Sequence, residues 1–144
     1  MPATDISPDR TAAEAARRGG PQLLAQCLRA SRQDTLSTFA ALEAVLPGLQ
    51  VPLHPELNPP LWELGHIGWF QQHWVSRNPQ RHLGWDADPG AVQTDADDQL
   101  YDSSAVPHDS RWQLKLPDAD TLRAQLAGQL EQTLACLQTL DDSD

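Results

Sequence analysis

The chain has 144 residues, which is the size of one domain with its own core. Acidic side chains outnumber basic ones by twenty to ten, and the formal net charge of -10 argues against a nucleic-acid surface, which needs clustered positive charge. The N-terminus lacks the apolar segment of a secretory signal, and no apolar run approaches the roughly 18 residues of a membrane span. We therefore expect a cytoplasmic protein that binds neither nucleic acid nor membrane.

Residues 1–20 show no apolar period and are rich in alanine, arginine and aspartate, so we expect a flexible tail that ends at Gly19-Gly20-Pro21. From residue 21 the apolar positions follow a helical period, and Pro47-Gly48 ends it. These positions are Leu24, Cys27, Leu28, Leu36, Phe39, Leu42 and Leu46. The pattern predicts a long first helix.

The second helix is predicted over about residues 59–77. Asn58 is a good N-cap, and the two prolines after it suit a first turn, where backbone N–H groups have no intrahelical partner. The helix ends at Asn78-Pro79, because a residue before proline resists the helical conformation.

One face of this second helix is aromatic. Trp62, His66, Trp69 and His73 follow one another at spacings of three, four and four, which places them along one side. Gly65 and Gly68 lie beside His66, although glycine costs up to about 1 kcal/mol relative to alanine in a helix. We therefore expect another backbone or a ligand to come close beside His66.

A third amphipathic helix begins near Asp118 or Asp120 and ends at about Leu140. Its apolar face consists of Leu122, Leu126, Leu130, Leu134 and Leu137. A connection of about forty residues precedes it, acidic between Asp86 and Asp98, and a loop of that length is either functional or partly disordered. Cys27 and Cys136 lie on separate helical stripes, which predicts two reduced core thiols and no disulfide.

Three antiparallel helices with one long crossover form an incomplete up-and-down bundle, which would leave the face of the third helix half covered. The final residues, 141–144, read Asp-Asp-Ser-Asp, which would suit the N-cap region of another helix. The sequence thus predicts an all-α bundle over residues 21–144. We expect its fourth helix to lie beyond the chain end, in a longer polypeptide.

Two segments together resemble a known family. Residues 58–70 read NPPLWELGHIGWF and residues 100–112 read LYDSSAVPHDSRW. They resemble the N-terminal DinB-like helix bundle of the iron-dependent sulfoxide synthases of ergothioneine biosynthesis, and more closely that of their selenium-handling relatives, the selenoneine synthases. The resemblance extends over about residues 21–144.

The resemblance implies a three-histidine Fe(II) site between the DinB-like bundle and a C-terminal domain that resembles formylglycine-generating enzyme. The Trp-x-x-Gly-His motif would supply its first ligand, which in this chain is His66. A His-x-x-x-His pair on the fourth helix would supply the other two, and this sequence has no such pair. The substrates implied are hercynine, a selenium or sulfur donor, and oxygen.

The other histidines have weaker claims. A histidine on an apolar helix face is commonly a core residue bonded to a backbone carbonyl, and for His66 only the motif favours the metal. His73 shares its face, but seven helical residues separate the two by about 10 Å, too far for one ion with ligand distances near 2 Å. His54 and His82 lie in predicted loops and are expected to be solvated. His108 matches the family segment and is a candidate for substrate binding.

Arg111 is a second candidate for substrate binding, because an arginine fork suits the carboxylate of an amino-acid betaine. The alternative is a salt bridge to one of the many nearby acids. Trp62 and Trp69 have two possible roles, cation–π contact with a trimethylammonium group or packing in the core. Asp95, Asp97 and Asp98 lack the spacing of a calcium loop, which favours a solvated loop over a cation site.

Two rival functions remain open. A stand-alone DinB-like module could act without catalysis, as a carrier or an oligomerisation unit. A DinB-like thiol transferase, also metal-dependent through three histidines, would need only the fourth helix. The sequence does not distinguish selenium from sulfur as the donor element, and it does not determine the oligomeric state.

Overall fold

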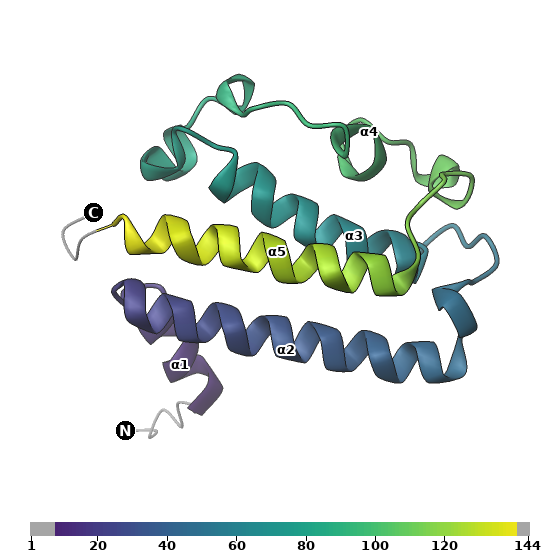
Figure 1. The fold of residues 1–144 in the computed structure, drawn as a ribbon, viewed down its shortest axis with the longest axis horizontal. Coiled ribbons are helices and arrows are strands. Elements are labelled where there is room, and N and C mark those ends of the chain that lie inside the picture. Colours follow the sequence, from purple (N-terminus) through teal and green to yellow (C-terminus); the bar gives the residue numbers. More distant parts are fainter. Residues whose placement is uncertain (1–7, 141–144) are drawn as a thin grey trace, which may run out of the picture.

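The computed structural model describes residues 8–140, and all regular structure in that part of the chain is helical (Figure 1). Three long helices make up the bundle: α2 (Pro21–Val45), α3 (Pro60–Gln71) and α5 (Ala119–Gln138). A π-helical turn, Gln72–Ser76, continues α3. The helix α5 packs against both α2 and α3. The predicted all-α bundle is confirmed.

The helices do not alternate in direction throughout. Gly68 of α3 lies against Gln129 of α5, and Gln72, one turn later, is hydrogen-bonded to Gln132, 2.8 Å away. Positions along the two helices thus advance together, so α3 and α5 are parallel. The connection over residues 77–118 carries the chain back along α3 to make this possible (Figure 1). The expected antiparallel order holds between α2 and α3 and between α2 and α5, where Arg123 near the start of α5 pairs with Glu43 near the end of α2, but not between α3 and α5.

The predicted ends of the helices agree with the structure, with one exception. Pro21 is the first residue of α2, and the Asp118 carboxylate caps α5 by accepting a hydrogen bond from the Thr121 backbone N–H at 2.8 Å. Asn58, by contrast, is not the N-cap of α3: Pro59 occupies that position. The Asn58 side chain instead bonds to Arg111 and Glu63.

The region predicted to be a tail contains helix α1, Pro8–Ala16. The helix was not expected from the sequence, and the flexibility of this region stays a prediction. Residues 1–7 and 141–144, including the acidic end read as a possible N-cap region, lie outside the described residues.

The core lies where α3, α5 and α4 (Asp98–Tyr101) meet, and its largest buried side chains include Trp62 and Tyr101. The apolar face of α5 is buried at four of five leucines, because α5 lies between the other two long helices. An apolar face that is only half covered was expected on α5 but lies on α3 and the π-helical turn that continues it. There Phe70 is 52% exposed and Trp74 is 38% exposed.

The long connection is built of short helices that follow α3 (Figure 1). They are η3 (Arg81–Asp86), η4 (Pro89–Ala91), α4 and η5 (His108–Trp112). Cys27 and Cys136 are unpaired, as predicted, but half-buried. Within residues 8–140, no helix combines the length and the apolar character that crossing a bilayer requires.

Candidate functional site

His66 lies at the middle of α3 in a fixed orientation. Its Nδ1 is 2.8 Å from the backbone oxygen of Tyr101. A carbonyl oxygen only accepts, so Nδ1 donates this hydrogen bond, and in the neutral form of the ring Nε2 carries the lone pair. Nε2 has no hydrogen-bond partner among the described residues, and the side chain is half-buried. The bond to a backbone carbonyl agrees with the alternative of a core histidine. A ring with one nitrogen held by a carbonyl and the other free is also the arrangement found in metal-binding histidines.

Two tryptophans enclose the His66 ring. Trp62 stacks on it with centroids 4.7 Å apart and planes 12° apart, and Trp69 follows at 5.6 Å and 23°. The indole N–H groups donate to α4, from Trp62 to the Leu100 oxygen and from Trp69 to the Asp98 carboxylate, each at 2.7 Å. Three ring N–H groups from one face of α3 therefore attach α4 and set the direction of His66.

Other side chains cover both faces of the Trp62 and Trp69 indole rings. Trp62 is 1% exposed and lies between the His66 ring and the Arg111 guanidinium, whose Cζ is 4.1 Å from the indole centroid. Trp69 is 4% exposed, between His66 and His73, whose centroid lies 4.8 Å away. This geometry supports the core role over contact with a trimethylammonium group.

Gly65 and Gly68, the two glycines beside His66, lie against side chains of α4 and α5. A Cβ on Gly65 would lie 2.3 Å from the Tyr101 ring, and one on Gly68 would lie 1.8 Å from Gln129 Oε1. Both distances are far inside van der Waals contact. Side chains of α4 and α5 make the close approach beside His66, where another backbone or a ligand was expected.

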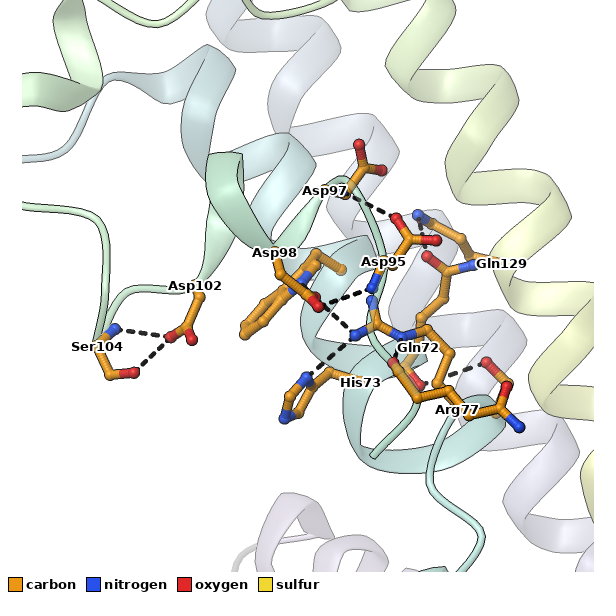
Figure 2. Close-up of polar contacts among 12 residues, drawn as sticks. Gln72, His73, Arg77, Asp95, Asp97, Asp98, Asp102, Ser104 and Gln129 are labelled. Carbon is orange, nitrogen blue, oxygen red and sulfur yellow. Dashed lines mark hydrogen bonds and ion pairs between the residues drawn. The ribbon is translucent and has the colours of Figure 1, made fainter. Parts of the chain in front are cut away.

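His73 belongs to a separate polar network around Asp98 (Figure 2). Asp98 Oδ1 accepts from Arg77 at 2.6 Å, and Oδ2 accepts from the Asp95 backbone N–H at 2.8 Å. Burial raises the pKa of Asp98, but its hydrogen bonds outweigh burial and hold the pKa below the ordinary value. Burial, and then the Arg77 charge, lower the pKa of His73. His73 lies against the Trp69 ring and its Nδ1 lies 3.4 Å from Arg77 Nη2, so it packs on the helix surface.

The acidic loop is more ordered than predicted. Asp95 is exposed, as a solvated loop requires, but Asp98 is built into the Arg77 network and is not simply solvated (Figure 2). Burial and the neighbouring Asp95 charge raise the pKa of Asp97. Over residues 8–140, no group of three or more histidine, cysteine, aspartate or glutamate side chains could hold a metal ion.

Arg111 is 9% exposed, and oxygens of its own chain bond to both Nη atoms of the guanidinium, while the buried Nε has no partner among the described residues. Nη1 donates to Asn58 Oδ1 at 2.6 Å, and Nη2 donates to the backbone oxygens of Val106 and Ser103 at 3.1 and 3.3 Å. Among the described residues no carboxylate pairs with it, so the alternative of a salt bridge is wrong. Arg111 holds the connection against the start of α3, and these contacts leave little of it for a substrate.

His108 lies at the start of η5 with both ring nitrogens engaged. Nδ1 is 2.8 Å from the Asp109 carboxylate, and Nε2 is 2.9 Å from the Leu57 oxygen. The Asp109 bond, followed by the Leu57 bond, raises the pKa of His108. Its role in substrate binding stays a prediction. His54 and His82 are exposed, as predicted.

The sequence matches a known protein family. The model of the DinB superfamily matches residues 27–144, most of the chain. The chain belongs to the DinB superfamily. No curated protein matches it. Superfamily membership accounts for the helical fold and extends over His66 and the connection that orients it.

Sequence reasoning missed two parts of this DinB-superfamily site. The Tyr101 carbonyl was not foreseen as the group that holds His66, because a backbone oxygen carries no residue signature. The Asp98 carboxylate, predicted to lie in a solvated loop, is the second. The tryptophan stripe could have indicated both, since a buried indole N–H requires an acceptor.

Proposed function

We propose that this bundle is the N-terminal part of a mononuclear non-haem Fe(II) enzyme that joins hercynine to a selenium or sulfur donor. The observation that carries the proposal is the state of His66, which stands in the Trp-x-x-Gly-His motif with Nδ1 held by Tyr101 and Nε2 free. Superfamily membership supports the fold that the proposal needs.

The residues present fit one ligand of such a centre. A neutral imidazole suits Fe(II), and a site with three protein ligands leaves open positions for substrate and oxygen. One imidazole does not hold iron against water, because affinity depends on the whole ligand set. We assign the remaining ligands to polypeptide outside the described residues, namely a His-x-x-x-His helix. A domain that resembles formylglycine-generating enzyme would close the site.

The chain's own residues would orient the ligand. The Tyr101 carbonyl fixes the tautomer of His66, and the Trp62 and Trp69 rings prevent the imidazole from turning. The pair of Arg77 and Asp98 holds α4, and with it the Tyr101 carbonyl, in place. Iron, when bound, would supply the reaction with oxygen, while these groups set only the position of its ligand.

The test is His66→Ala in the full-length enzyme, with His73→Ala as the matched control on the same helix face. We expect His66→Ala to lose iron and turnover while the circular dichroism spectrum stays that of the parent, because a half-buried ring leaves no large cavity. His73→Ala should keep its iron. Metal analysis and turnover of hercynine measure both. Full iron occupancy with normal turnover in His66→Ala would rule out the ligand assignment.

The same experiment addresses the rival function. A DinB-like thiol transferase would use the same free imidazole, and superfamily membership is common to both. Loss of metal in His66→Ala, combined with thiol transfer and no hercynine turnover in the parent protein, would favour the transferase.

A further inference from the structure

Arg32 is a buried arginine without an acidic partner. It lies in the middle of α2, four residues after Leu28 and four before Leu36, at a position where the helix otherwise carries apolar side chains. The residue is 7% exposed, and among the described residues no carboxylate lies within ion-pair distance of it. Burial lowers the pKa of Arg32, and no acidic neighbour opposes this shift.

Among the described residues, the hydrogen bond that the Arg32 side chain makes is to one amide. Arg32 Nη2 donates to Oε1 of Gln71 at the end of α3, so this hydrogen bond joins α2 and α3, the two helices that flank α5. Two donors of this pair, Arg32 Nη1 and Gln71 Nε2, are buried and have no partner among the described residues. An arginine stays charged at any accessible pH, so the lowered pKa does not remove the need for an acceptor.

Both free donors belong to groups joined by one hydrogen bond, so they lie close together. A carboxylate accepts hydrogen bonds at both oxygens and carries the charge that a buried guanidinium lacks. A neutral acceptor would satisfy the donors but would leave the charge uncompensated, which is costly in the interior. Both donor atoms are buried, so a carboxylate reaches them only when the side chains around the pair move apart.

We propose that Arg32 and Gln71 form a binding site for the carboxylate of a small molecule, with Arg32 Nη1 and Gln71 Nε2 as the donors. The site is separate from His66 and does not depend on the proposed iron centre. It also differs from the carboxylate clamp expected at Arg111, whose Nη atoms are already occupied by Asn58 and two backbone oxygens.

The probe for this site is acetate, compared with chloride at equal ionic strength. We expect acetate to raise the melting temperature of the wild-type chain in a saturable manner, because a ligand that binds only the folded state stabilises it. The Gln71 side-chain amide signals in ¹⁵N-resolved NMR spectra should shift over the same range of acetate concentration. Chloride should produce neither effect.

The matched variants are Arg32→Met and Arg29→Met. Arg29 is an exposed arginine on the same helix, one turn earlier. Arg32→Met removes a buried charge and keeps an apolar side chain, a change that folded proteins commonly tolerate. We expect it to raise the apparent dissociation constant of acetate at least about tenfold, the loss of one charge-assisted contact. Arg29→Met should respond as the wild type does.

If Arg32→Met does not fold, Gln71→Met tests the same site, because it removes one donor and leaves the charge. It should weaken acetate binding about threefold or more.

Equal acetate responses in the wild type and Arg32→Met would overturn the proposal. So would a wild type that responds no more to acetate than to chloride, because a buried water would then satisfy the donors. A wild type that is dimeric, insensitive to acetate and made monomeric by Arg32→Met would also overturn it, and would assign the carboxylate to a second copy.

Discussion

Gly65→Ala adds one methyl group at the most crowded point beside His66. The new Cβ would lie 2.3 Å from Cε1 and 2.4 Å from Cζ of Tyr101, whereas ordinary contacts begin at 3.4 Å. The Tyr101 ring is 2% exposed and packs on Trp62, with ring centroids 6.4 Å apart. The ring therefore has little room to retreat, and the substitution must displace α4 from α3.

Two opposing effects decide the magnitude. Alanine favours the helix by about 1 kcal/mol over glycine. Overpacking a core typically costs about 1–3 kcal/mol, and a rigid ring held more than 1 Å inside contact distance places this site near the upper end. The net expectation is a loss of about 2 kcal/mol in the free energy of unfolding, which lowers the melting temperature of a chain of this size by about 4–8 °C.

The assay is thermal and urea unfolding followed by circular dichroism, with Gly128→Ala as the matched control. Gly128 lies within α5, and a Cβ there would meet nothing within 4 Å. Gly128→Ala should therefore raise the melting temperature by about 2–4 °C, the helix propensity effect alone. In the double variant with Tyr101→Ala, the cost of Gly65→Ala should largely disappear.

The steric reasoning fails if Gly65→Ala is as stable as Gly128→Ala. Additive effects in the double variant with Tyr101→Ala would refute it as well, because the two positions would then not be in contact.

Two further predictions concern Arg111 and Asp98. Arg111→Lys should lower the free energy of unfolding by about 2–3 kcal/mol, because an ammonium cannot reach Asn58 and both backbone oxygens together. An unchanged melting temperature together with a raised KM for the substrate would instead favour a role of Arg111 in binding the substrate carboxylate. For Asp98, the folded pKa is below the ordinary value of 3.8, so its stabilisation is present above that pH and is lost as the pH falls through the lowered pKa. Asp98→Asn should therefore flatten the acid limb of stability measured by urea unfolding between about pH 2 and pH 5, and an unchanged limb would contradict the role of the Arg77 pair.

Local rules account for what the sequence alone determined. The first and last residues of α2 and α5 follow from the apolar period and from the proline, glycine and aspartate residues that start or end a helix. These signals act within one turn of the chain. The face shared by Trp62, His66 and Trp69 follows from the helical repeat. The same rules failed at Asn58, because a distant arginine competed for its side chain.

Only the tertiary structure decided which groups meet across the chain. His66 bonds to an oxygen 35 residues away, Arg111 to an amide 53 residues away, and Arg32 to an amide 39 residues away. Periodicity determines which face a side chain occupies, but not which segment the crossover brings to that face or in which direction α5 then runs. The positions of the helices along the chain can therefore be predicted from the local sequence. The partners of buried polar groups depend on packing, because each must find an acceptor or donor wherever the fold provides one.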